Sequence, residues 1–145
     1  MKLKGQCLCG AVRYAFEGDP LFVFLCHCRD CQQSSGSLLH FGLIVPEVQF
    51  NREGEVRAYS KKSDAGREIT REFCPNCGSG IDNRLELLPG AVVIKGGTLD
   101  DPSALAPTFE LFARSKVSCF DGGASLRSFP GDVTVDPSEL MWKAS

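Results

Sequence analysis

The segment Cys26-His27-Cys28-Arg29-Asp30-Cys31 places three cysteines within six residues. Alternation along a strand puts Cys26 and Cys28 on one face, and a turn at the next two residues brings Cys31 back toward them. Three thiolates in so short a stretch can hold one metal ion and leave a fourth coordination position open. An open position is typical of a catalytic rather than a structural zinc.

The remaining cysteines lie on either side of this segment. Two further clusters are spaced C-x-C and C-x-x-C, and they consist of Cys7, Cys9, Cys74 and Cys77, while Cys119 stands alone. Structural disulfides more often join distant segments and need an oxidising compartment. The first residues contain no hydrophobic stretch of signal-peptide length. The clusters therefore favour metal-binding thiolates in a reducing cytoplasm over disulfides or redox-sensing thiols.

Seven clustered thiolates divide into four plus three, and two partitions are open. In the first, the C-x-C pair and the C-x-x-C pair close one tetrahedral zinc site, and the central triple holds a second ion. In the second, Cys28 and Cys31 join the C-x-x-C pair in a zinc ribbon. The C-x-C pair and Cys26 are then left for the other ion, with Cys119 as a possible fourth ligand. The spacing of the central triple favours the first partition.

Composition limits the class of protein. The 145 residues are one domain's worth of chain, 43% of them are hydrophobic and 23% are charged, and this balance can bury a core. The formal net charge of -2 gives no polybasic character, so nucleic acid is not an expected partner. No apolar run approaches the roughly 20 residues that span a bilayer. We expect a single cytoplasmic domain, residues 1–145, that does not enter a membrane.

Short strand-like segments separated by turn residues dominate the pattern. The strand candidates are residues 11–16, 21–25, 38–45, 55–60, 67–73, 91–95, 108–113 and 117–120. Only residues 29–35 and the turn around 101–106 look helical. The pattern predicts a mostly β fold with metal sites at strand ends and a thin core that closed zinc sites would stabilise.

Three motifs together resemble a known family. They are GQCLCGAVRY at residues 5–14, CHCRDCQQSSG at 26–36 and FCPNCG at 73–78. They are similar to motifs of the glutathione-dependent formaldehyde-activating enzymes, a family shared with centromere protein V, and the match covers a core of about residues 5–130. The resemblance implies a fold of the β-tent (Mss4-like) type, with small antiparallel sheets and zinc-binding knuckles.

The resemblance also implies the first partition, with two Zn²⁺ ions per chain. The residues that match the structural zinc site are Cys7, Cys9, Cys74 and Cys77. Those that match the catalytic zinc site are Cys26, Cys28 and Cys31. One departure is visible, because the resemblance leads us to expect a Trp within residues 116–120, where this chain has Cys119.

The family's named activity is a carbon–sulfur lyase reaction that forms S-(hydroxymethyl)glutathione. The resemblance therefore implies an enzyme that takes glutathione as co-substrate and adds its thiolate to a small aldehyde such as formaldehyde. The alternative is a zinc-stabilised binding module of the same fold without catalytic activity, in which a protein ligand closes the second site. A homodimer is possible because small β proteins have exposed sheet edges.

Other side chains near the motifs carry weaker expectations. We expect His27 to be packed or hydrogen-bonded rather than a ligand, His40 to be a satisfied core or rim histidine, and Cys119 to be a small buried hydrophobe. Residues 34–36 could line a pocket or cap a short helix. Glutathione has two carboxylates, and the cationic candidates to bind them, by position only, are Arg29, Lys61, Lys62, Arg67 and Arg71.

Overall fold

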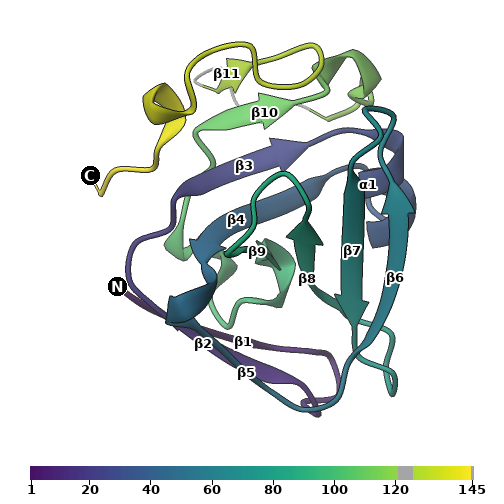
Figure 1. The fold of residues 1–145 in the computed structure, drawn as a ribbon, viewed down its shortest axis with the longest axis vertical. Coiled ribbons are helices and arrows are strands. Elements are labelled where there is room, and N and C mark those ends of the chain that lie inside the picture. The colour runs from purple at the N-terminus through teal and green to yellow at the C-terminus, as the bar shows by residue number, and fades with distance from the viewer. Residues whose placement is uncertain (121–125, 145) are drawn as a thin grey trace.

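The computed structural model describes residues 1–120 and 126–144, so residues 121–125 and 145 of the predicted domain lie outside the described residues. Two sheets make up most of the fold (Figure 1). The small sheet has the order β1 (Lys2–Gln6), β2 (Arg13–Glu17), β5 (Phe50–Glu53). The large sheet has the order β11 (Arg127–Ser128), β10 (Phe109–Leu111), β3 (Phe22–Cys26), β4 (His40–Pro46), β9 (Ala91–Lys95), β8 (Gly80–Leu85), β7 (Glu68–Phe73), β6 (Arg57–Lys62).

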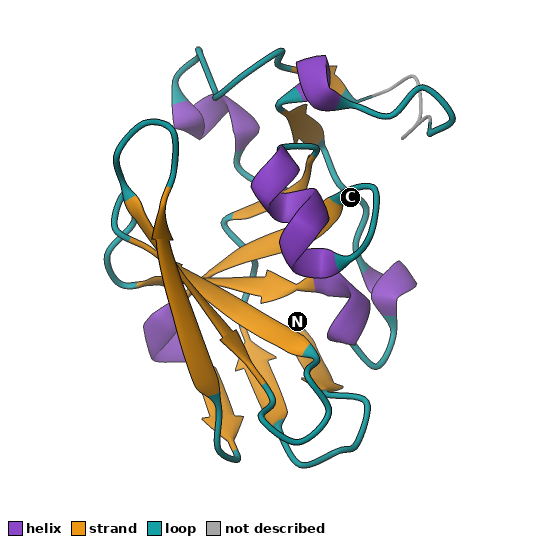
Figure 2. Ribbon diagram, turned by 90° about the vertical axis from the view of Figure 1, so that its right-hand side faces the viewer, coloured by secondary structure: helices purple, strands orange, loops and turns teal. Residues whose placement is uncertain are grey.

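Helical structure is sparse in the described residues, as Figure 2 shows. The α-helix is α1 (Arg29–Ser35), at the bounds that the sequence predicts. The short 3-10 helices are η1 (Glu47–Gln49), η2 (Gly96–Thr98), η3 (Pro102–Ala104), η4 (Ala113–Ser115) and η5 (Pro137–Leu140). The prediction of a mostly β fold built from antiparallel sheets is confirmed. No helix in residues 1–120 or 126–144 has both the length and the apolar character needed to cross a membrane.

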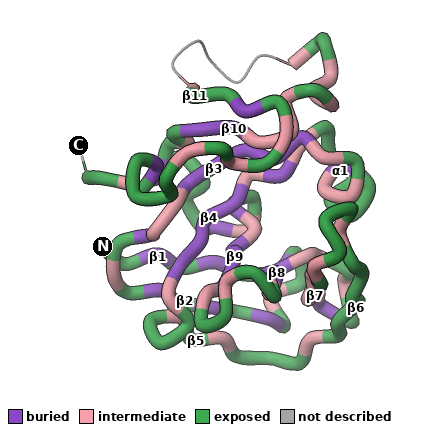
Figure 3. The backbone as a smooth tube through the Cα atoms, turned by 45° about the horizontal axis from the view of Figure 1, so that its top comes forward, coloured by how far each residue is buried: buried purple, intermediate pink, exposed green. Residues whose placement is uncertain are grey.

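Burial follows the sequence pattern of each strand. β1 and β2 alternate exposed and buried residues, which packs one face of the small sheet and leaves the other in water. The central strands β3, β4 and β9 are apolar along most of their length and are buried on both faces. β6 is exposed throughout, and Figure 3 shows the contrast between it and the buried centre.

The central strands supply side chains to two hydrophobic cores. Leu43 and Ile94 point into a core that lies between the two sheets and includes Phe16 of the small sheet. Neighbouring residues on the same strands, Ile44 and Val93, point the other way into a core that includes Phe109 and the C-terminal segment. The large sheet is therefore the middle layer of the molecule. Polar side chains buried on either of its faces are unusual, and each requires a hydrogen-bond or ion-pair partner.

Most predicted strands agree with the structure, and three differences are informative. The strand predicted at 117–120 is wrong, because that stretch forms a turn. The polar strands β1, β5 and β8 were not predicted, since they lack a long apolar run. The large sheet also contains parallel pairs, in which β10 lies between β3 and β11.

Candidate metal centre

Four cysteines from two distant loops meet at one point. Cys7 and Cys9 follow β1, Cys74 and Cys77 lie between β7 and β8, and their sulfur atoms all lie within 4.8 Å of one another. The Sγ atoms of Cys7 and Cys9 are 3.6 Å apart, and those of Cys9 and Cys74 are 3.8 Å apart. Zinc–sulfur bonds of 2.3 Å in a tetrahedron require sulfur separations of roughly 3.8 Å. This four-cysteine cluster therefore has the dimensions of a tetrahedral zinc site.

The two loops of the four-cysteine cluster turn in the same way. Gly10 and Gly78 follow the second cysteine of each pair, both have φ of 77°, and both donate their N–H back to the carbonyl of the first cysteine. Glycine adopts this left-handed conformation without a steric penalty. The Ser79 hydroxyl lies 3.2 Å from Cys77 Sγ and lowers the pKa of that thiol to about 5. The loops thus hold the four sulfur ligands in a pre-arranged geometry, with Cys77 as a readily ionised thiol.

A three-cysteine cluster forms where β3 ends and α1 begins. Cys26 is the last residue of β3, Cys28 is the N-cap of α1, and the N–H of Cys31 donates to Cys28 Sγ over 3.3 Å. The three sulfur atoms lie within 4.8 Å of one another. No fourth His, Cys, Asp or Glu ligand atom joins them in the part of the chain that the structure describes. The cluster therefore offers three ligands to an ion.

The three thiols of this cluster lie so close together that their ionisation is coupled. Hydrogen bonds from the thiols of Cys26 and Cys31 lower the pKa of Cys28 to about 2. The hydrogen bond with Cys28 raises the pKa of Cys26 in turn. One sulfur can thus ionise only while its neighbours keep their protons, since like charges this close oppose each other. A soft divalent cation such as zinc relieves the conflict, so the donor set fits that ion.

Side chains from the same segment, between and after the three cysteines, hold it in place by hydrogen bonds to residues outside the cluster. His27 is fully buried, and its Nε2 lies 2.8 Å from Glu110 Oε2, which confirms that it is hydrogen-bonded and outside the cluster. Lys116 Nζ lies 3.1 Å from the other Glu110 oxygen. Gln32 Nε2 donates to the carbonyls of His27 and Ser115. Sequence reasoning missed Glu110 and Gln32, although a glutamate in an apolar strand was a signal for the first.

Cys119 and His40 depart from expectation. Cys119 is exposed at a turn and lies outside both clusters, so the prediction of a small buried hydrophobe is wrong. The grouping of the other seven sulfurs corresponds to the first partition. His40 is buried opposite Cys26 as a core residue, but its Nε2 finds no partner among the described residues, so it is not satisfied. Burial lowers the pKa of His40 to about 3, and its imidazole is neutral at pH 7.

Most cationic candidates are already paired. Arg29 hydrogen-bonds to Gln32, Lys61 pairs with Asp30 over 2.7 Å and Arg67 pairs with Asp132 over 3.2 Å. Arg71 is half-buried, and its Nε has no partner within residues 1–120 or 126–144. The Ser35 hydroxyl donates to the Cys31 carbonyl, and Gly36 closes α1 at φ of 66°, so residues 34–36 cap the helix.

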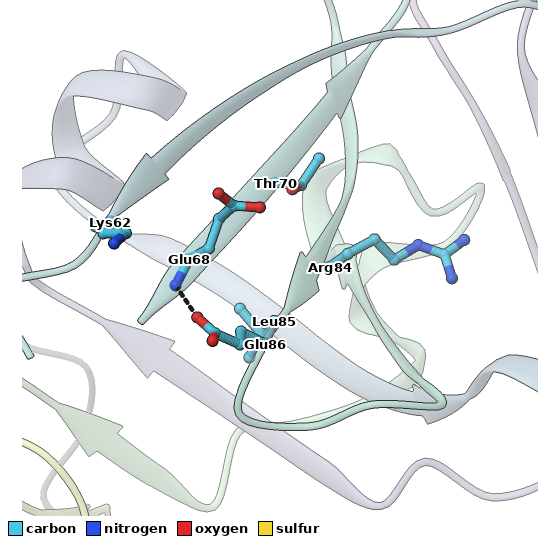
Figure 4. A pocket seen from close by; sticks show the side chains of 6 residues that line it. All are labelled: Lys62, Glu68, Thr70, Arg84, Leu85 and Glu86. Carbon is cyan, nitrogen blue, oxygen red and sulfur yellow. Dashed lines mark hydrogen bonds between the residues drawn. The ribbon is translucent and has the colours of Figure 1, made fainter. Parts of the chain in front are cut away.

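Two surface hollows lie away from the cysteines. One is lined by Lys62, Glu68, Thr70, Arg84, Leu85 and Glu86 (Figure 4). Within it, the backbone N–H of Glu68 donates to Glu86 Oε2 over 2.6 Å. The second hollow shares Arg84 and Leu85 with the first. Neither hollow is lined by a cysteine, so neither is the site of the three-cysteine cluster.

Comparisons with known proteins give one family and one fold. The family model of the glutathione-dependent formaldehyde-activating enzyme matches residues 2–115. A search of the curated proteins gives no match. The crystal structure of a Rhodobacter sphaeroides protein is 19% identical, with a TM-score of 0.53 over 67% of this chain and 87% of that one. At this identity the likeness concerns the fold alone.

Proposed function

The chain belongs to the family of the glutathione-dependent formaldehyde-activating enzyme, and from this premise we propose that it adds the thiol of glutathione to a small aldehyde such as formaldehyde. We further propose that the four-cysteine cluster holds a structural zinc and the three-cysteine cluster a catalytic zinc. The observation that carries the proposal is the three-cysteine cluster itself, with three sulfurs together and no fourth ligand in the described residues.

The proposed reaction forms one carbon–sulfur bond. The thiolate sulfur attacks the carbonyl carbon, the carbonyl π bond breaks, and the thiol proton ends on the former carbonyl oxygen, so atoms balance without an oxidant. Zinc at the three-cysteine cluster would supply a position for a fourth sulfur and lower the pKa of a substrate thiol. The protein's own contribution is to hold the sulfur ligands, and through them the reactants, in position.

The protein's own residues orient the three sulfurs. The N–H of Cys31 fixes Cys28 Sγ at the start of α1, and the His27–Glu110 contact holds the intervening residue inside the core. Gln32 fastens the first turn of α1 to the Ser115 carbonyl. Because backbone and side chain hold the segment at several points, the cluster keeps its shape as ligands exchange.

The alternative, a binding module with two closed sites, requires a protein ligand at the fourth position. The His and Cys residues outside the two clusters are His27, His40 and Cys119. His27 is engaged with Glu110, and Cys119 is exposed outside both clusters. His40 lies opposite Cys26 on the neighbouring strand, but it is not grouped with the three sulfurs. These placements favour the enzyme.

The test measures zinc content and adduct formation together. We expect two zinc ions per chain and faster formation of S-(hydroxymethyl)glutathione, followed by NMR, than in solution without protein. Cys28→Ser should lower the rate at least about tenfold while the circular dichroism of the fold persists. Cys119→Ser is the matched control and should keep the full rate. An unchanged rate after removal of zinc would overturn the proposal.

A further inference from the structure

Four polar side chains near the three-cysteine cluster have buried atoms without a hydrogen-bond partner among the described residues. They are His40 Nε2, Arg71 Nε, Asn83 Oδ1 and Lys95 Nζ, and we call these four residues the polar row. Roughly nine in ten buried polar groups in folded proteins are paired. The two other such atoms belong to His27 and Asp82, whose second polar atom is engaged. Four unpaired groups on neighbouring strands point to a partner from outside the chain.

Strand register puts the polar row on one face of the large sheet. Arg71 on β7 lies opposite Asn83 on β8, which in turn lies opposite a β9 residue two positions before Lys95. Lys95 lies opposite a β4 residue two positions after His40, and His40 lies opposite Cys26. Residues that are opposite each other, or two apart on one strand, share a face. The row therefore crosses four strands and ends at the three-cysteine cluster.

Glycine and α1 shape the surroundings of the row. A Cβ added at Gly80 would lie 3.6 Å from Lys95 Cε, so the lysine side chain runs across that glycine. Lys61 lies two residues from the partner of Arg71 on β6, and its ion pair with Asp30 ties that strand to α1. The helix α1, which contains Cys31, and the strand pair β6–β7, which contains Arg71, thus approach each other on this face.

The charge of the polar row is positive. Arg71 and Lys95 are cations, and neither forms an ion pair with a carboxylate in residues 1–120 or 126–144, whereas Asn83 and His40 are neutral hydrogen-bonding groups. Burial lowers the pKa of Lys95, and the thiols of the three-cysteine cluster act against that effect. Two cations that have no carboxylate partner in the described residues suit a substrate carboxylate, which accepts charge-assisted hydrogen bonds.

We propose that the polar row binds a carboxylate of the thiol substrate, with Arg71 and Lys95 as the charged partners. This inference rests on the proposed function and assigns a substrate class to it. The site takes thiols that carry a carboxylate within reach of the sulfur, and it discriminates against neutral and cationic thiols. None of the four residues needs to touch the reacting atoms, so they act in binding and specificity.

The test compares glutathione with its diethyl ester, which keeps the thiol and loses both carboxylates. Dissociation constants are measured by calorimetry on the zinc-loaded protein at fixed pH and ionic strength. We expect glutathione to bind at least about tenfold more tightly than the diester. Lys95→Met and Arg71→Met should each bring this ratio close to one. Lys4→Met is the matched control, since it removes an exposed lysine of β1 and should leave the ratio unchanged.

Stability supplies a second readout. Because Lys95 Nζ has no partner in the described part of the chain, Lys95→Met should leave the unfolding temperature of the ligand-free protein unchanged or raise it. A fall of several degrees would give Lys95 a structural role and overturn the inference. S-methylglutathione, which keeps both carboxylates, should bind the wild type and lose affinity in Arg71→Met.

The outcomes separate the inference from the proposed function. Equal affinity for glutathione and its diester overturns the carboxylate site and leaves the proposed function intact. Failure of both to bind overturns the proposed function. If both Lys95→Met and Arg71→Met still bind glutathione at least about tenfold more tightly than the diester, other residues bind the carboxylate and the inference is overturned.

Discussion

Asp82 lies on β8 with no exposed surface, and it shares its surroundings with a second carboxylate. Arg52 Nη1 lies 2.5 Å from Asp82 Oδ2 and 2.8 Å from Glu72 Oε2. Burial raises the pKa of Asp82 to about 7. Burial opposes the shift of Glu72, but hydrogen bonds from Asp82 and Arg52 lower its pKa to about 2. The two carboxyl groups therefore share one proton below neutral pH.

Asp82→Asn should become increasingly stabilising, relative to the wild type, as pH rises from about 4 to about 7. In that range the unfolded chain has already lost the Asp82 proton while the folded protein still binds it, so the wild type loses stability with rising pH. The variant has no proton to lose at this position. The gain should be about 1 kcal/mol per pH unit, measured as a difference in free energy of unfolding in urea.

The difference between the two proteins cancels the titration of shared groups that do not interact with Asp82, cysteines included. Asp64→Asn, at an exposed position in the turn between β6 and β7, is the matched control and should show no such trend. A pH-independent difference for Asp82→Asn would show that the folded protein binds no proton at this carboxyl.

At the same scale, the cysteines could be predicted from sequence and the polar row could not. Spacings such as C-x-C-x-x-C report local geometry, so the triple was visible directly. Lys95 and Asn83 meet Arg71 only through the register of β7, β8 and β9. His40 joins them through the pairing of β4 with β9, and these two strands lie far apart in the chain. The missing signal is a long-range pairing, which no local pattern contains.

At the scale of elements, Arg52 joins the two sheets. It lies on β5 of the small sheet, and its guanidinium contacts Glu72 on β7 and Asp82 on β8 of the large sheet. Most of its side chain is buried, with 18% exposed. The contact therefore holds the small sheet against β7 and β8 of the large sheet.

Arg52→Met should destabilise the protein by about 2 kcal/mol, because it removes the closer of the two guanidinium groups that face Glu72 and Asp82. Arg84 stays, with its Nε 3.4 Å from Glu72 Oε2 and 3.5 Å from Asp82 Oδ1. Urea unfolding at pH 7.5 measures the change. Arg57→Met, on the exposed strand β6, is the control and should stay within about 0.5 kcal/mol of the wild type. The double variant with Asp82→Asn should recover part of the loss. A loss no greater than that of the control would contradict this role.

The elements that sequence reasoning missed share this polar character. β8 carries Asp82, Asn83 and Arg84 in succession, which no hydrophobic period reveals as a buried strand. β8 can be buried because Arg52 pairs with Asp82 on one face of the strand, while Asn83 belongs to the polar row on the other face. The prediction of a strand at 117–120 is wrong for the opposite reason. The segment contains apolar residues, but it pairs with no strand in the described residues.

At the scale of the molecule, the four-cysteine cluster brings the loop after β1 together with the loop after β7. One ion held there would cross-link the small sheet to the large sheet. The three-cysteine cluster lies within one short segment, so an ion there would constrain less of the chain. The two clusters should therefore contribute unequally to stability.

Removal of metal by a chelator should lower the unfolding temperature by about 10 °C. Differential scanning calorimetry of variants divides the effect between the clusters. Cys77→Ser should cost more than Cys31→Ser, and Cys119→Ser should behave as the wild type. Equal losses for the first two variants would contradict the assignment of the four-cysteine cluster as the cross-link.

The cytoplasmic location, the lack of nucleic-acid partners and the homodimer stay predictions. For a dimer, the edge of the large sheet matters most. β6 carries Arg57, Lys61 and Lys62 along this edge, and all are exposed. Charged residues disfavour pairing between sheet edges, so a dimer would form through another surface.

The separation of the two clusters along the chain has a consequence during translation. A growing polypeptide presents Cys26, Cys28 and Cys31 together as soon as that short segment leaves the ribosome. Cys7 and Cys9 leave earlier, but their partners Cys74 and Cys77 do not yet exist. The first complete set of thiols is thus the one proposed for chemistry, and it forms before the set proposed to stabilise the fold. Metal supply and oxidants in the cell therefore meet the three-cysteine segment before the rest of the protein has folded.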